Sequence, residues 1–188
     1  MLLVTTALPS GHEYTNTQAY GGRGWCIAEK LMSAIVKDQD ALIDMGKLKG
    51  SESTVADLVK HGKSERPPPM APDAFHAMLK SGVEDESIKF TNKGDVELVA
   101  TIYRRAFLDE MSAATALHYG QLGWGDEQLV TLSMALTFAH ASGALASVTE
   151  LRLYDNQIGD QGMIKLSEAL ASGALEQVTC LSLANNNI

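Results

Sequence analysis

The stretch Ala-Ser-Gly-Ala-Leu-Ala-Ser-Val-Thr-Glu-Leu-Arg-Leu-Tyr-Asp-Asn-Gln-Ile, at residues 141–158, returns thirty positions later at residues 171–188. Eleven of the eighteen aligned positions are identical. A repeat of this period indicates one supersecondary unit stacked on its own copy. The shared pattern L-x-x-V-x-x-L-x-L-x-x-N-x-I falls on Leu145, Val148, Leu151, Leu153, Asn156 and Ile158, and again on Leu175, Val178, Leu181, Leu183, Asn186 and Ile188.

Each copy is predicted to form a short strand, a turn and a helix. Leu151 and Leu153 are two residues apart, so both point to one face of a strand, whereas Arg152 points to the other. The segment 159–162, Gly-Asp-Gln-Gly, is typical of a turn. Gly173 is expected to end the helix that follows, in which apolar residues recur at helical spacing at Met163, Leu166, Ala169 and Leu170.

A more divergent copy lies just upstream. With a shift of thirty-four residues it gains four residues, about one helical turn, which we expect inside its helix at residues 137–140. Leu122 stands where the other copies have asparagine, and the bulky Trp124 follows it. Because the terminal units of repeat arrays are usually atypical, this first unit is expected to be a cap. The aligned pairs are Leu117 with Leu151, Tyr119 with Leu153, Gly125-Asp126 with Gly159-Asp160, and Leu132-Ser133 with Leu166-Ser167.

The pattern resembles the leucine-rich repeat of the long kind found in ribonuclease-inhibitor-like proteins. The resemblance implies an α/β fold in which residues 114–188 form a short, curved solenoid of one degenerate, one complete and one truncated repeat. It also implies an asparagine ladder, in which buried amides such as that of Asn156 satisfy backbone groups of the turns.

The function that this resemblance implies is protein binding through the concave strand face. Arg152 and Tyr154 are the strongest candidates there, because Arg and Tyr are enriched at interface hot spots. His118 also lies on this face in the alignment. The full set of variable strand positions is Ala116, His118, Gly120, Glu150, Arg152, Tyr154, Cys180, Ser182 and Ala184.

The third unit reaches Ile188 with its strand made and without a following helix, so an apolar face is expected to be uncovered. Three explanations stay open. The chain is a fragment, it is a truncated gene product without stable function, or the face is covered by a partner or by self-association.

Residues 1–50 carry a second motif. Residues 2–4 predict a strand, Trp25-Cys26-Ile27-Ala28-Glu29 leads into an apolar helical run, and residues 41–43 predict another strand. This order, with its Trp-Cys-x-x-Glu motif, is similar to the second half of a Toll/interleukin-1 receptor-like (TIR) domain. We therefore expect an α/β TIR-like remnant here.

In TIR enzymes that cleave NAD, the glutamate of that motif is catalytic, and the matching residue is Glu29. A carboxylate there would stabilise positive charge developing on the ribose. The competing interpretation is that Glu29 opens a helix, where the helix dipole favours a carboxylate whatever its function. Because the first half of a TIR domain is missing, we expect no enzyme activity and keep NAD hydrolysis as the alternative.

Residues 51–72 predict a basic, Pro-rich linker interrupted by a short helix at 53–61. Its prolines at 67–69 and 72 favour extended polyproline geometry. Residues 73–113 predict a helical cap region that packs under the first repeat. Its first helix would be capped by Asp73 and end at Gly82, and its second would be capped by Asp95. The basic residues in and beside the linker are Lys47, Lys49, Lys60, Lys63 and Arg66, and the apolar stripe of the second helix is Val96, Leu98, Val99, Ile102, Tyr103, Ala106, Phe107 and Met111.

Composition narrows the classes of partner. The net charge of −8 argues against nucleic acid, whose binding depends on clustered Lys and Arg. Two distant cysteines, Cys26 and Cys180, favour a reducing compartment, and no apolar run has the length of a membrane span. The five histidines show no metal-ligand spacing. We therefore expect a cytoplasmic signalling or recognition protein with a protein partner, without metal, cofactor, nucleic acid or membrane.

Overall fold

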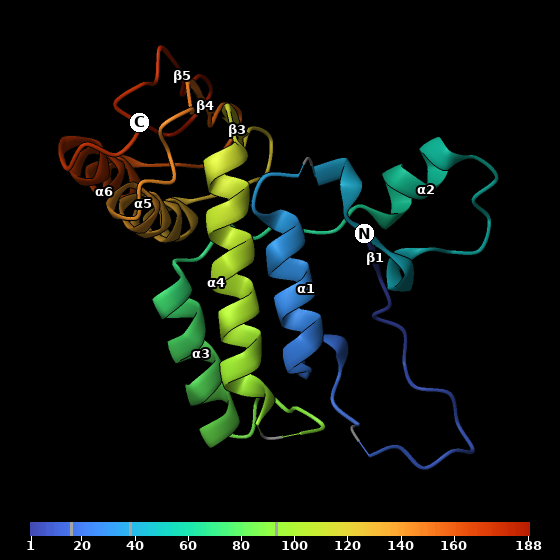
Figure 1. Cartoon of the computed structure of the whole chain (residues 1–188). Helices are drawn as coiled ribbons and strands as arrows, with labels where there is room; N and C mark the ends of the chain where they lie inside the picture. Colours follow the sequence, from blue (N-terminus) through green and yellow to red (C-terminus); the bar gives the residue numbers. More distant parts are fainter. Residues whose placement is uncertain (16, 38, 93) are drawn as a thin grey trace. The chain divides into compact units, whose positions relative to one another are not determined.

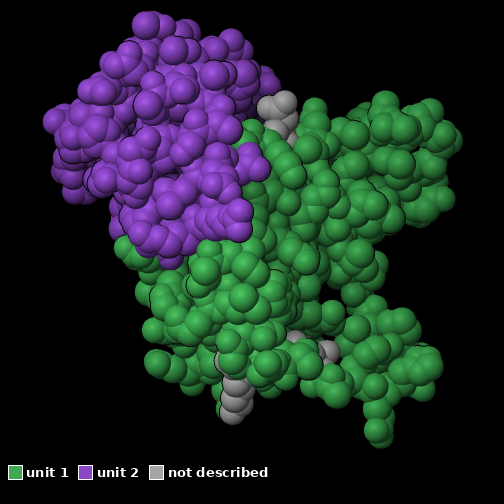
Figure 2. All heavy atoms as spheres, viewed as in Figure 1, with its two compact units in different colours: residues 1–66, 73–103 green, residues 67–72, 104–188 purple. Residues whose placement is uncertain are grey.

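The computed structural model describes residues 1–15, 17–37, 39–92 and 94–188. It combines helices with short strands, so the chain is mixed α/β, as expected (Figure 1). Two compact units are distinguished in Figure 2: unit 1 comprises residues 1–66 and 73–103, and unit 2 comprises residues 67–72 and 104–188. The division between them falls within helix α4 (Asp95–Ala113). The four segments expected from the sequence stay a prediction.

Unit 1 begins with the expected strand, helix and strand. Strand β1 (Leu2–Leu3) pairs in parallel with β2 (Ile43–Asp44), and α1 (Gly24–Ala34) connects them. The second strand starts two residues later than predicted, because Gln39–Ala41 forms the 3₁₀ helix η2. Two further 3₁₀ turns are η1 (Tyr20–Gly22) and η3 (Met45–Lys47).

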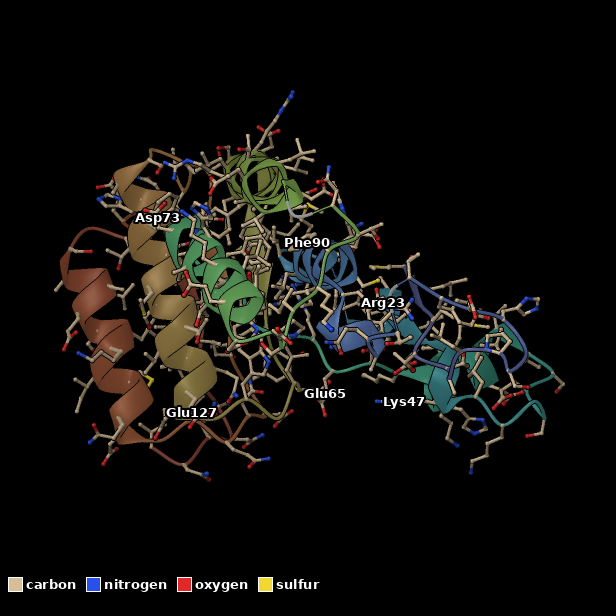
Figure 3. The ribbon with its side chains drawn as sticks, turned by 90° about the horizontal axis from the view of Figure 1, so that it is seen from below. Arg23, Lys47, Glu65, Asp73, Phe90 and Glu127 are labelled. Carbon is tan, nitrogen blue, oxygen red and sulfur yellow. The ribbon has the colours of Figure 1, made fainter. Side chains whose placement is uncertain are left out.

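The start of α1 is held by residues from far along the chain. The backbone N–H of Gly24 donates to Lys89 O at 3.0 Å, so the extended piece expected at residues 88–90 pairs with the entry of this helix. A Cβ on Gly24 would overlap the ring of Phe90, which is labelled in Figure 3. Trp25 is half-buried and donates from Nε1 to Asp95 Oδ2 at 2.8 Å. Asp95 is the first residue of α4 and binds this indole.

Arg66 is one of the basic residues in the segment predicted to be a Pro-rich linker. Its side chain is buried and donates from Nε to Ala34 O at 2.9 Å and from Nη2 to Ile35 O at 3.2 Å. These are carbonyls at the end of α1, where a cation is favoured by the helix dipole. The helix expected at residues 53–61 is present as α2 (Val55–Gly62).

Gly82 does not end its helix as predicted. Helix α3 spans Pro72–Glu84, so Pro72, not Asp73, opens it, in the position where its fixed φ suits a helix. A Cβ on Gly82 would lie 2.5 Å from Ile88 Cδ1, so this glycine permits close packing of the chain that follows. In α4, Tyr103 is buried with its ring 4.0 Å from that of Phe75.

The predicted stripe of α4 is only partly buried. Leu98 and Ile102 are exposed, whereas Val99 and Tyr103 are in the core. In unit 2, the second half of α4 supplies buried Phe107, whose ring meets that of Phe138 edge-on at 5.9 Å. Phe138 lies in α5, the helix of the first repeat, so α4 contacts this helix through the two rings.

Unit 2 contains a three-stranded parallel sheet in the order β3 (Ala116–His118), β4 (Glu150–Arg152), β5 (Cys180–Ser182). Leu117 pairs with Leu151, and Leu151 pairs with Leu181, so the register has the shifts of thirty-four and thirty residues that the sequence alignment predicted. Helix α5 (Asp126–Ala141) has 16 residues and α6 (Asp160–Ala171) has 12. The four additional residues of the first repeat therefore lie in its helix, α5, as predicted.

The predicted turn at residues 159–162 is mostly helix. Helix α6 begins at Asp160, and Gly162 lies inside it because α5 approaches closely there. A Cβ on Gly162 would lie 3.1 Å from Asp126 Cα and 3.2 Å from Leu129 Cβ. Asp126 Oδ1 accepts from the N–H of Gly162 at 3.0 Å. Gly173 follows the end of α6 as predicted, with the positive φ of 96° that favours glycine.

The buried side chain of Asn156 completes the hydrogen bonds of the turn in the first repeat. Asn156 Oδ1 accepts from the N–H groups of Leu122 and Trp124, both at 3.0 Å. Its Nδ2 donates to Tyr119 O at 2.7 Å and to Leu153 O at 3.0 Å. One side chain thus satisfies four backbone groups that the strand pairing does not reach.

Asn186 makes the same kind of hydrogen bonds one repeat later. Its Nδ2 donates to Leu153 O and Leu183 O, both at 2.9 Å, and its Oδ1 accepts from Ile158 N at 3.1 Å. Each asparagine therefore binds backbone of the repeat that precedes it. The first repeat has Leu122 at this position. Its interior is filled by Trp124, whose ring is stacked on that of Tyr119 with 5.0 Å between the ring centroids.

The apolar side of the sheet is covered at β3 and β4 and open at β5. Leu117 and Leu151 are fully buried, whereas Leu181, in register with them, is 43% exposed and Ile188 is 58% exposed. The third repeat thus has the uncovered apolar face that the sequence predicted.

Replacement of Asn156 by alanine tests the importance of the buried amide. We expect Asn156→Ala to lower the free energy of unfolding of unit 2 by about 3 kcal/mol or more, because four buried backbone groups lose their partner. The measurement is urea unfolding followed by the fluorescence of Trp124, with Trp25→Phe in every variant to remove the other tryptophan.

Asn185→Ala is the matched control, since Asn185 is exposed and binds only the side chain of Asp155 in the hydrogen bonds described. A loss for Asn156→Ala no larger than that of the control would contradict the structural role of the ladder.

Candidate functional site

The sheet of unit 2 presents its second side to solvent. Because side chains alternate along each strand, the residues between the buried leucines point away from the core. The parallel register aligns two rows across the strands, and backbone hydrogen bonds just beyond the strands continue the alignment to a third row. We call these rows the strand face: Ala116, Glu150 and Cys180; His118, Arg152 and Ser182; Gly120, Tyr154 and Ala184. All five residues predicted to bind a partner, His118, Glu150, Arg152, Tyr154 and Ser182, lie on this face.

Glu150 forms the electrostatic centre of the strand face. Its Oε1 accepts a hydrogen bond from Arg152 Nε, and its Oε2 lies 3.7 Å from His118 Nε2. The carboxylate thus joins the side chains of two adjacent strands. His118 and Arg152 both expose 44% of their side-chain surface, so the cluster is accessible to a partner.

The ion pair keeps both of its members charged. The hydrogen bond from Arg152, followed by the charges of Arg152 and His118, lowers the pKa of Glu150 below its usual range. In turn, the hydrogen bond and charge of Glu150 raise the pKa of Arg152. The guanidinium is therefore oriented by a carboxylate through Nε.

Tyr154 covers a glycine on the neighbouring strand. A Cβ on Gly120 would lie 2.7 Å from Tyr154 Cε1, so the absence of a side chain lets the ring lie on the sheet, half-buried. Tyr154 and Arg152 are two residues apart, so they lie on the same side of the chain.

A polar row at the border of the strand face was missed by the sequence analysis. Asp155 Oδ2 accepts from Gln121 Nε2 at 3.2 Å, and its Oδ1 accepts from Asn185 Nδ2 at 2.6 Å. These residues have the same shifts of thirty-four and thirty positions as the leucines, so the alignment contained the signal. All three have positive φ, which Asn and Asp tolerate better than most residues.

Glu29 belongs to unit 1, whereas the strand face belongs to unit 2. It is the sixth residue of α1 and is exposed, so the prediction that it opens the helix is wrong. The helix starts earlier, at Gly24, because that residue packs against Phe90. Burial, followed by the charge of Glu29, raises the pKa of Cys26. Burial, followed by the charges of Cys26 and Glu29, raises the pKa of Tyr20. Its catalytic role stays a prediction.

The residues that the structure describes contain no group of three or more His, Cys, Asp or Glu side chains placed to hold a metal ion. None of their helices has the length and apolar character needed to cross a membrane. Comparisons with protein-family models, curated proteins and solved structures found no match to the chain.

The pKa of Glu150 reports directly on its pairing with Arg152. A carboxylate whose pKa is lowered by folding adds stability above its unfolded pKa, and this stability is lost as the pH falls through the folded pKa. We expect NMR titration of the Glu150 carboxyl carbon to give a pKa below the usual glutamate range. Arg152→Gln should raise that pKa toward the usual range.

Arg105→Gln serves as the control, because Arg105 is exposed on α4 and pairs with Asp109 instead. An unchanged pKa of Glu150 in the Arg152→Gln variant would show that the ion pair does not form in solution.

Proposed function

We propose that this chain is a protein–protein interaction module of leucine-rich-repeat type, part of an intracellular signalling or recognition protein, and that it binds its partner through the strand face. The observation that carries this proposal is the register of the sheet. It buries Leu117 and Leu151 on one side and, on the other, aligns variable polar and aromatic residues across three adjacent strands. Such an arrangement holds a recognition surface on a repeated core.

The chemistry of the strand face suits binding. Arg and Tyr side chains dominate many interface hot spots, and here Tyr154 follows Arg152, the last residue of β4, by two positions. The pairing of Arg152 with Glu150 and the seating of Tyr154 on Gly120 restrict both side chains before a partner arrives. Less side-chain entropy is then lost on binding, so more of the contact energy is retained in the affinity.

The cysteines support a reducing environment. Both are free thiols, and Cys180 is exposed on the strand face next to Arg152. An exposed thiol beside a binding surface is compatible with the cytoplasm, where thiols stay reduced. The cytoplasmic location is accordingly part of the proposal.

Affinity capture from the source cells, quantified by mass spectrometry, tests the proposal. We expect at least one protein to be recovered by the unmodified chain and to fall by about tenfold or more with Arg152→Ala and with Tyr154→Ala, since losing a hot-spot side chain costs about 2 kcal/mol. The melting temperatures should stay close to that of the unmodified chain, because both side chains lie on the outer face of the sheet.

Lys165→Ala is the control for this experiment. Lys165 lies on α6, exposed and paired with Glu168, so its loss removes a cation from unit 2 without touching the strand face. Recovery of the same proteins in equal amounts by all four chains would refute binding through the strand face.

A further inference from the structure

Strand β5 has a free edge. It pairs with β4 on one side, and its other side has no neighbouring strand among the described residues. The N–H of Cys180 donates to Thr149 O at 3.2 Å. The carbonyl of Ser182 accepts from Leu153 N at 2.8 Å, so Cys180 and Ser182 both direct their backbone groups toward β4. Because these groups alternate along a strand, Leu181 directs its N–H and C=O to the free edge, where they can pair with another strand.

Apolar side chains lie at the same end of unit 2. Leu181 is 43% exposed, whereas Leu151, its partner in the register, is fully buried. On α6, Ile164 is 49% exposed and lines a shallow hollow. Gly162 packs against α5 on the opposite side of α6, so the hollow faces away from α5 as the free edge faces away from β4. A strand added to β5 would place every second side chain over this apolar surface.

The charge of unit 2 selects between possible occupants of this edge. The unit contains nine Asp and Glu side chains and four Lys and Arg side chains, a formal charge of −5 with neutral histidines. Three of the four cations already form ion pairs with acidic side chains of the same unit. Asp160 and Glu168 also border the hollow on α6. This field attracts a positively charged partner and opposes the approach of a second copy of the unit.

We infer that the free edge of β5 binds an extended, positively charged segment of another protein as a fourth strand of the sheet. The backbone of the segment bonds to the N–H and C=O of Leu181. Its apolar side chains alternate with Lys and Arg, and they cover Leu181 and the outer side of α6. The inference goes beyond the strand face, because it uses the backbone edge of β5 and the apolar side of the sheet.

Amide hydrogen exchange of the full chain, followed by proton–nitrogen NMR, tests the inference with three blocked heptapeptides. The first alternates Lys with Val, the second alternates Glu with Val, and the third alternates Lys with Ser. The Lys-Val peptide is expected to shift the amide of Leu181 in a saturable manner and to slow its exchange by about tenfold or more, because the N–H gains a carbonyl partner. The other two peptides are expected to bind at least tenfold more weakly, since each lacks either the charge or the apolar residues.

Each contrary result has a definite meaning. An unchanged exchange rate of Leu181 with the Lys-Val peptide overturns the inference. Equal binding of the Glu-Val peptide overturns the choice of a basic partner, and equal binding of the Lys-Ser peptide overturns strand addition in favour of non-specific attraction. Slow exchange of Leu181 without peptide, in a chain that sediments as a dimer, overturns the inference in favour of a second copy.

A matched pair of variants locates the binding edge. Leu181→Lys should weaken the Lys-Val peptide by about tenfold or more, because an apolar contact is replaced by a like charge. Leu98→Lys makes the same change at a leucine of unit 1 that is 51% exposed, and it should leave the affinity unchanged. Equal affinities of the two variants, in spectra that keep the dispersion of the unmodified chain, overturn the role of β5.

Discussion

The buried amide of Asn156 is the interaction on which unit 2 depends. Each strand has only three residues, so strand pairing leaves the backbone of the following turn without partners. Asn156 supplies two donors and two acceptor positions at that point, and it does so from inside the core. Without it, these buried backbone groups would have no partner, at a cost of about 1–3 kcal/mol for each group. The side chains of the strand face keep their spacing because this turn is fixed.

Internal repetition made the register of unit 2 predictable. Two alignments, shifted by thirty-four and thirty residues, determined which leucines pair, which residues share the solvent side, and how much longer α5 is than α6. Unit 1 has no such repetition. Its elements were located approximately, but the buried role of Arg66 was not predicted, because a sequence does not show which carbonyls an arginine reaches.

The predictions failed for two glycines and did not include the contacts of one carboxylate. Gly82 and Gly162 were interpreted as chain breaks, yet both lie inside helices where another segment comes within contact distance of the backbone. A sequence does not show whether a glycine ends a helix or permits close packing inside one. Likewise, the alignment placed Glu150 and His118 on one face, but the link through the Glu150 carboxylate depends on rotamers that repetition does not determine.

The direction of the asparagine contacts has a consequence for biosynthesis. Asn156 binds backbone at Tyr119 and Leu122, and Asn186 binds backbone at Leu153 and Ile158, so each amide is made on the ribosome after the turn that it serves. When one repeat has just emerged from the ribosome, the backbone donors and acceptors of its turn still have no partner. The hydrogen bonds of that repeat are complete only when about thirty more residues have emerged. Folding of unit 2 therefore lags behind translation by one repeat.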